Sequence, residues 1–204
     1  MTLSHYSESE YHAVVARVQR ELPTTGYVVL GLLSFGRELT GYELKQWADG
    51  SIRFFFASPA MSQIYDELDR LERLGHVRGR DDSRGSDRAR RTFRITPSGT
   101  AALRRWIGAD APAPVMKHAV ALRLFLGHLA RPERLEALLR EHEQRTIALL
   151  ADLDEVRANL AGDDTLQFAA IVAEWGCRFY EGELDATRAA FAALTQASAG
   201  TGTV

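Results

Sequence analysis

Residues 58–74, which read SPAMSQIYDELDRLERL, are the stretch that most limits what this chain can fold into. On a helical wheel, Met61, Ile64, Leu68 and Leu71 fall on one side, at the spacing of a buried stripe. The other side begins with short polar residues and ends with arginines. That face suits a DNA major groove, where short polar side chains reach base edges and arginines reach phosphates. An ordinary amphipathic surface helix is the alternative that this stretch alone leaves open.

The segments on either side favour the DNA interpretation. Two helices are predicted before the stretch, at about 26–35 and, after a Thr40–Glu43 capping box, at about 40–48. After it, residues 76–80 and 91–96 alternate between apolar and polar, which predicts a β-hairpin with a long polar loop. A further helix is expected after Thr96. Three helices followed by a hairpin form the order of a winged helix-turn-helix domain, in which the third helix enters the groove and the hairpin is the wing.

Two local details are predicted within this domain. The aromatic segment 52–56 could be a short extended piece. Ser58 is expected to be the N-cap of the third helix, with Pro59 at the first helical position, where a missing N–H costs nothing. Gly75 is expected to end that helix.

The charge distribution supports a role for the wing in binding nucleic acid. The 204-residue chain has a formal net charge of −2, so its total charge does not favour nucleic acid. Between positions 78 and 94, however, seven arginines stand against three aspartates. This local positive surplus coincides with the predicted wing. A solvated loop that touches nothing is the alternative.

The second half of the chain is predicted to be helical and to form a dimer. Prolines and small residues at 109–114 predict a linker, and helices are expected at about 115–129, from Pro132 onward and at about 166–194. Apolar residues repeat at heptad spacing along the last two, which predicts an antiparallel pair whose seam is shared with a second subunit. The predicted interface consists of Leu135, Leu139, His142, Leu149, Leu153, Val156, Phe168, Val172 and Trp175.

The fold class is therefore mainly α. We expect an N-terminal winged helix-turn-helix domain with a two-stranded wing, followed by an all-helical, antiparallel, coiled-coil-like dimerisation domain. The predicted parts are an amphipathic helix in 1–23, the DNA-binding domain in 24–108, the linker in 109–114, the dimerisation domain in 115–196 and a flexible tail in 197–204.

The segments VLGLLSFGRELTGYELKQ, SPAMSQIYDELDRLERLGHVRG and RRTFRITPSGTAALRRWI resemble the PadR family of transcriptional regulators over about residues 24–107. The helical second half resembles the C-terminal dimerisation region of the longer PadR-like subfamily by its layout. The resemblance implies a homodimer that binds a palindromic operator on double-stranded DNA, usually to repress. It also implies that a small aromatic or amphipathic effector often releases the DNA.

Candidate DNA-binding residues follow from these positions. Ser62, Gln63 and Asp66 are the predicted base readers, since Gln suits adenine and Asp can accept from cytosine. Asp66 would repel phosphates, so a local salt bridge is its alternative role, and core packing is the alternative for Tyr65. The remaining candidates contact the backbone or the minor groove: Tyr42, Lys45, Ser58, Arg70, Arg73, Arg84, Arg88 and Arg90.

Other kinds of site find little support. Trp175 and Phe179 could line an aromatic effector pocket, with simple core packing as the alternative. None of the six histidines shows HExxH or paired-cysteine spacing, so we expect no metal and no cofactor. No catalytic motif is present, so we expect no enzyme.

The expected setting is the cytoplasm, because the N-terminus does not read as a signal peptide and no apolar run reaches the length of a membrane span. Two alternatives remain open at this point. One is a winged-helix adaptor that binds protein, which would not need the wing arginines. The other is a MarR-like regulator, whose DNA-binding helices would lie between its dimer helices.

Overall fold

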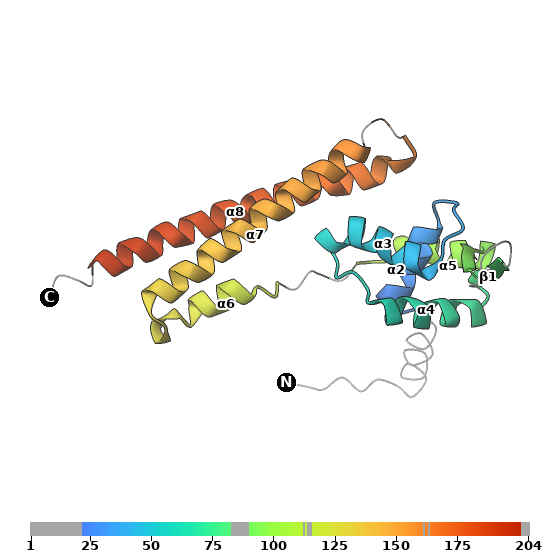
Figure 1. Ribbon diagram of the computed structural model, residues 1–204, viewed down its shortest axis with the longest axis horizontal. Coiled ribbons are helices and arrows are strands. Elements are labelled where there is room, and N and C mark those ends of the chain that lie inside the picture. The colour runs from blue at the N-terminus through green and yellow to red at the C-terminus, as the bar shows by residue number, and fades with distance from the viewer. Residues whose placement is uncertain are drawn as a thin grey trace, which may run out of the picture. The chain divides into compact units, whose positions relative to one another are not determined.

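A computed structural model describes residues 22–82, 90–111, 113, 116–160, 162 and 164–200. The chain divides into two compact units, with the division after Ala111, within the predicted linker. The predicted N-terminal helix up to residue 21 and the central part of the wing, 83–89, lie outside the described residues. Figure 1 shows both units.

The first unit has the predicted winged helix-turn-helix order, which confirms the fold class. Its Thr40–Glu43 capping box is present, because Thr40 Oγ1 accepts from Glu43 N and Glu43 Oε2 accepts from Thr40 N. Gly75 ends the third helix with a φ of +71°, a conformation that glycine adopts without strain. The elements are α2 (Thr24–Leu33), α3 (Gly41–Ser51), η1 (Ile52–Phe54), α4 (Met61–Arg73), β1 (Val77–Asp82), β2 (Arg90–Ile95) and α5 (Pro97–Ile107).

Two local predictions were wrong. The third helix, α4, begins at Met61 with Ala60 as its N-cap, so Ser58 does not cap it. The hydroxyl of Ser58 instead donates to Asp49 Oδ1 at 2.6 Å, a contact with α3 that local spacing cannot reveal. The segment 52–56 is not extended, since Ile52–Phe54 form a 3₁₀ turn that continues α3 and buries Phe54.

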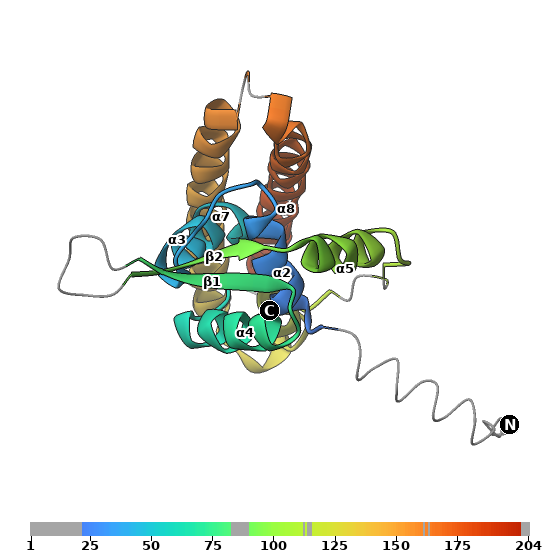
Figure 2. The same cartoon turned by 90° about the vertical axis from the view of Figure 1, so that its right-hand side faces the viewer.

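The wing is a ribbon of two antiparallel strands, β1 and β2 (Figure 2), that is fixed to the domain by a third contact. Val77 pairs with Ile95, and Gly79 pairs with Phe93. Leu39, in the loop before α3, forms a bridge to Phe93 through two backbone hydrogen bonds of 3.0 and 2.8 Å. The wing is therefore held by the loop between α2 and α3 as well as by the pairing of its two strands.

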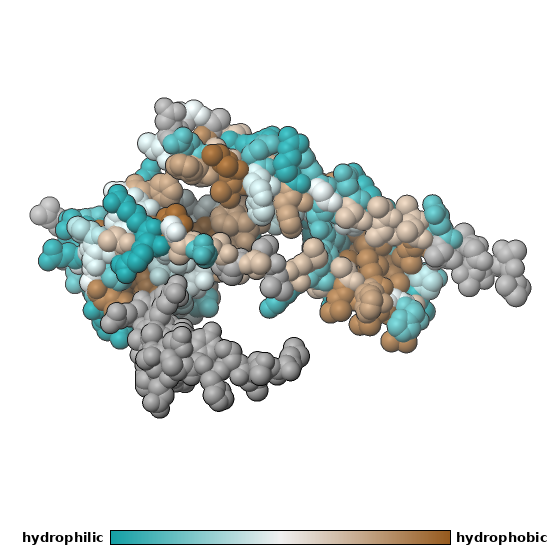
Figure 3. Space-filling model, turned by 180° about the vertical axis from the view of Figure 1, so that it is seen from behind, coloured by the Kyte–Doolittle hydropathy of each residue, from teal (hydrophilic) through white to brown (hydrophobic). Residues whose placement is uncertain are grey.

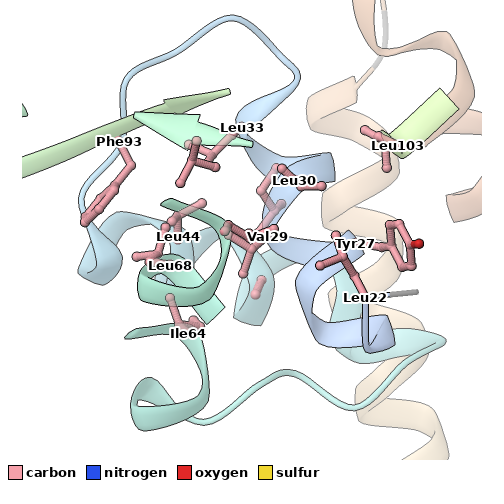
Figure 4. Close-up of a cluster of buried hydrophobic side chains, with 14 residues drawn as sticks. Leu22, Tyr27, Val29, Leu30, Leu33, Leu44, Ile64, Leu68, Phe93 and Leu103 are labelled. Carbon is pink, nitrogen blue, oxygen red and sulfur yellow. The ribbon is translucent and has the colours of Figure 1, made fainter. Parts of the chain in front are cut away.

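A single apolar core holds the three helices and the wing together (Figure 4). Leu30 of α2, Leu44 of α3 and Leu68 of α4 are fully buried, and Phe93 of β2 closes the core from the wing side. Burial of one such side chain is worth about 1.5–3 kcal/mol. The core thus fixes the position of α4 and leaves its opposite face free.

Every regular element among the described residues of the second unit is a helix. The long pair α7 and α8 packs side by side, as Figure 1 shows, and the shorter α6 lies against α7. The last helix runs to Gly200, so the tail predicted from 197 is helical at its start. The elements are α6 (Ala119–Phe125), η2 (Gly127–Leu129), α7 (Pro132–Leu160), η3 (Asp164–Leu166) and α8 (Gln167–Gly200). Among the described residues, no helix combines the length and apolarity that a membrane crossing requires.

The predicted heptad seam serves mainly to join α7 to α8 within one chain. Leu135, Leu139 and Leu153 are buried, with at most 8% of their surface exposed. They were predicted to contact a second subunit, and in this structure their side chains are covered within their own chain. Leu149 and Val156 are partly buried.

The apolar residues of this unit that remain exposed lie elsewhere. Phe168, Val172 and Trp175 of α8 are exposed, as are Leu122 and Phe125 of α6. Figure 3 shows apolar residues gathered over the end of the unit that carries α6. The helical unit therefore has exposed apolar residues on α6 and on α8 that are not part of its internal seam.

Candidate nucleic-acid interface

Helix α4 presents a polar face on a rigid support. Ile64, Leu68 and Leu71 are at most 1% exposed, so the helix cannot turn without opening the core. Ser62 and Asp66 lie on the exposed face, as predicted from the helical wheel. A helix held on one side and polar on the other can present side chains to base edges at fixed positions.

Gln63 has a structural role that the sequence did not show. Its Oε1 accepts a hydrogen bond of 2.8 Å from the backbone N–H of Ala60, the residue that precedes the helix. Because Ala60 has no side-chain acceptor of its own, this contact is only the reciprocal half of a capping box. Gln63 would have to release this bond to present both amide atoms to an adenine.

Lys45 and Ser58 are brought together by an aspartate at the end of α3. Ser58 Oγ lies 3.4 Å from Lys45 Nζ, and both groups contact the Asp49 carboxylate. The hydrogen bonds from Lys45 and then from Ser58 hold the pKa of Asp49 below its ordinary value. This cluster connects α3 to the segment that leads into α4. Both candidates are partly committed to internal contacts.

The two tyrosines lie at the start of α3 and along α4. Tyr42 is 59% exposed, and its hydroxyl accepts a hydrogen bond from Gln46 Nε2 at 3.2 Å. The ring of Tyr65 lies against Gly41, where an added Cβ would come within 2.7 Å of a ring carbon. With 47% of its surface exposed, Tyr65 both packs against α3 and reaches solvent.

The arginines of α4 are at its C-terminal end, where the helix dipole favours cations. Arg73 donates to the Asp69 carbonyl at 3.3 Å, and Arg70 lies 3.7 Å from Glu67 Oε2. Asp66, for which a salt bridge was the alternative, has no ion pair among the described residues.

Three arginines of the wing were predicted to bind DNA. Two of them, Arg84 and Arg88, lie outside the described residues. Arg90 begins β2, where its backbone pairs with Asp82. Arg91 ties the wing to α4, since its guanidinium donates to Glu72 Oε2 at 2.7 Å.

Two further arginines on the strands were not among the predicted DNA-binding residues. Arg78 and Arg94 are directly opposite each other on β1 and β2, and both side chains are exposed. Within the described residues neither has an ion-pair partner, whereas Arg80 beside them pairs with Glu38 at 3.0 Å. Like charges placed opposite one another destabilise a ladder. A phosphate between them would remove that repulsion. Their outward position in the alternating segments was the available sequence signal.

In the second unit, the predicted effector residues do not enclose a cavity by themselves. Trp175 and Phe179 stack on α8 with ring centroids 5.7 Å apart, and both are more than half exposed. Cys177 between them points to the opposite, buried side, where burial raises the pKa of its thiol. The two rings therefore form a surface patch in the single chain.

Each of the two units is similar to a known protein family. The transcriptional regulator PadR-like family matches residues 29–105, and the family of the virulence activator alpha C-terminal region matches residues 116–195. The negative transcriptional regulator PadR of Bacillus subtilis is 32% identical over 129 residues, which cover 62% of this chain and 69% of that protein.

Solved structures show the same fold. The crystal structure of Bacillus subtilis PadR in complex with operator DNA matches with a TM-score of 0.75 and 22% identity, over 84% of this chain and 99% of that one. Its complex with p-coumaric acid matches with a TM-score of 0.67 and 21% identity, over 83% of this chain and 94% of that one.

The exposed polar face of α4, the arginine-bearing wing and the separate helical unit define a DNA-binding transcriptional regulator of the winged helix-turn-helix class. Within that class, the chain belongs to the PadR-like family, as its identity to the Bacillus subtilis regulator shows.

Proposed function

We propose that two copies of this chain bind a two-fold symmetric operator and repress transcription from it. The observation that carries the proposal is the exposed polar face of α4 on a helix whose other face is fully buried. Each α4 would enter the major groove at one half-site. Two half-sites lie about 34 Å apart, one turn of DNA, so a two-fold dimer is required.

The chemistry of the exposed residues fits this role. Gln63 can present an amide to adenine, and Ser62 can bond to any base edge. Tyr42, Lys45, Arg70 and Arg73 would contact phosphates, which positions the helix without reading sequence. The paired strand arginines Arg78 and Arg94 would add to the loop arginines of the wing, and all of them would make binding dependent on salt.

Dimerisation is supported by the exposed apolar surface of the helical unit. Phe168, Val172 and Trp175 remain the proposed contacts, because they are exposed on α8 while the seam leucines are not. Large exposed apolar patches mark interaction sites in soluble proteins. A second copy of the same unit would cover these residues through an isologous contact.

Release by a small aromatic acid is the proposed mode of regulation. Bacillus subtilis PadR has been solved with p-coumaric acid. In this chain Trp175 and Phe179 form one aromatic wall, and a pocket would need a second wall from the partner subunit. A protein that works in this way acts in the cytoplasm and has no need of catalysis.

Binding of the chain to its own upstream DNA tests the proposal. Fluorescence anisotropy with and without competitor DNA should show a specific complex, and footprinting should show two protected half-sites. The control is a variant with Ser62 and Gln63 both changed to alanine, which leaves the buried face of α4 intact. If no complex forms at low salt, the adaptor interpretation replaces this one.

Activation is the second candidate for the output, because the C-terminal unit matches a family named for a virulence activator. A reporter gene behind the bound promoter, with and without the regulator, separates the two outputs. Reporter activity that rises when the regulator is removed means repression. Activity that falls means activation.

A further inference from the structure

Three side chains from separate helical segments of the second unit converge on one point. His118 is the N-cap of α6, His142 lies in α7 and Glu183 lies in α8. His118 Nε2 is 2.6 Å and His142 Nε2 is 2.7 Å from the same atom, Glu183 Oε1. All three side chains are only 20–25% exposed. Their positions are 41 and 65 residues apart from Glu183 in sequence, so spacing alone could not predict the cluster.

We propose that His118, His142 and Glu183 form a binding site for a divalent first-row transition metal ion such as Zn²⁺. Two imidazoles and one carboxylate are a ligand set that zinc accepts, with the fourth position left to water or another ligand. The three ligand atoms lie within 4.8 Å of one another. Ligands of a tetrahedral ion with bonds near 2.0–2.1 Å stand about 3.3 Å apart, so only a small opening of the present contacts is needed.

Glu183 Oε1 is the point on which the cluster converges. Within the described residues, its carboxylate pairs with no lysine or arginine, and its partners are the two imidazoles.

The tautomer of His118 follows from its neighbours. The backbone N–H of Ala121 donates to His118 Nδ1 at 3.0 Å, so Nδ1 carries no proton. The proton of the neutral ring is then on Nε2, which donates to Glu183.

A metal ion at Nε2 would reverse this arrangement. The proton would move to Nδ1, and the cap hydrogen bond from Ala121 would be exchanged for one to water. Metal binding would thus be coupled to the first turn of α6. His142 has no such constraint and can bind through Nε2 after a simple shift of its proton.

Titration of the full chain with Zn²⁺ and with Co²⁺, after removal of metal with a chelator, tests the site. Calorimetry should show one metal ion bound per chain, and Co²⁺ should give the visible absorption of a low-symmetry nitrogen and oxygen site without a thiolate band. Glu183→Gln and His142→Ala should each weaken binding by at least about tenfold to a hundredfold. His128→Ala is the matched control, because His128 is exposed on η2 outside the cluster.

A second readout does not depend on affinity. If the tautomer of His118 changes, the amide of Ala121 should exchange faster and shift in the NMR spectrum when metal is added, while the fold measured by circular dichroism stays the same. The proposal is overturned if the wild type binds Zn²⁺ no more tightly than Glu183→Gln, or if His128→Ala loses as much affinity as His142→Ala. None of these measurements requires DNA. Their outcome therefore tests the metal site independently of the proposed function.

Discussion

Substitutions of Gln63 should affect the stability of the protein and its affinity for DNA in different ways. Its Oε1 accepts the Ala60 N–H at 2.8 Å in the free protein. Removal of this exposed bond in Gln63→Ala should lower the free energy of unfolding by about 0.5–1.5 kcal/mol. The same change removes the amide proposed to read adenine, which should cost about 1–3 kcal/mol, or roughly 5- to 150-fold in affinity, at one base pair of each half-site.

Gln63→Glu separates the two effects. Glutamate keeps an acceptor oxygen for Ala60 and adds a negative charge in the first turn of α4, which favours the helix by about 0.3–1 kcal/mol. The variant should therefore be as stable as the wild type or more so. Its DNA affinity should nevertheless fall, because a carboxylate has no donor for adenine N7 and is repelled by phosphates.

Urea unfolding and fluorescence anisotropy on the operator, on single base-pair variants and on random DNA measure these quantities. Base reading by Gln63 requires that Gln63→Ala lose affinity for the operator and lose discrimination at one position. Equal loss on the operator and on random DNA would refute it. A Gln63→Ala variant that unfolds no more easily than the wild type would show that the Ala60 contact does not stabilise the helix.

Five other substitutions probe three separate parts of the molecule: the wing, the buried side of α4 and the helical unit. Arg78→Ala and Arg94→Ala should each weaken binding to all DNA sequences alike. Each should also reduce the slope of log affinity against log salt concentration by about one per lost phosphate contact. An unchanged slope would exclude a phosphate contact by that arginine. Burial raises the pKa of Glu67, whose Oε2 has no hydrogen-bond partner among the described residues. Ionisation of this carboxyl group therefore destabilises the folded state at pH values above 4.5, the pKa of the group in the unfolded chain. Glu67→Gln should therefore raise the free energy of unfolding at pH 7 by about 1 kcal/mol, and urea unfolding should show this gain shrinking as the pH falls to 4.5. Leu139→Ala should lower the free energy of unfolding of the protomer by about 2–5 kcal/mol. Trp175→Ala should instead weaken dimerisation about 30-fold or more, as measured by analytical ultracentrifugation, and leave the unfolding of the protomer little changed.

The parts of the fold that could be predicted from the sequence depend on neighbouring residues. The Thr40–Glu43 capping box is a contact over three residues, and the turn at Gly75 depends on one backbone angle. The apolar stripe of α4 follows from its spacing alone. Each of these signals lies within a single helix or at its end, which is why each was confirmed.

The contacts that the sequence did not reveal join residues of different elements. Ser58 was assigned as an N-cap by its neighbours, but its hydroxyl bonds to Asp49, nine residues earlier on another helix. The bridge from Leu39 to Phe93 spans 54 residues. The His118, His142 and Glu183 cluster joins three helical segments. Contacts of this kind depend on how the elements pack, and no local pattern specifies them.

The heptad seam shows a further limit that bears on function. Its spacing identifies a continuous apolar strip on α7, and it does not say whether that strip faces another helix of the same chain or of a second chain. The structure assigns Leu139 and Leu153 to the pairing of α7 with α8. We propose that a dimer uses a different surface, because the exposed rings of Phe168 and Trp175 lie on α8 away from that seam. Because the two apolar surfaces are separate, selection can change the strength or angle of the dimer without unfolding the protomer. A regulator that must match the half-site spacing of one operator needs that independence.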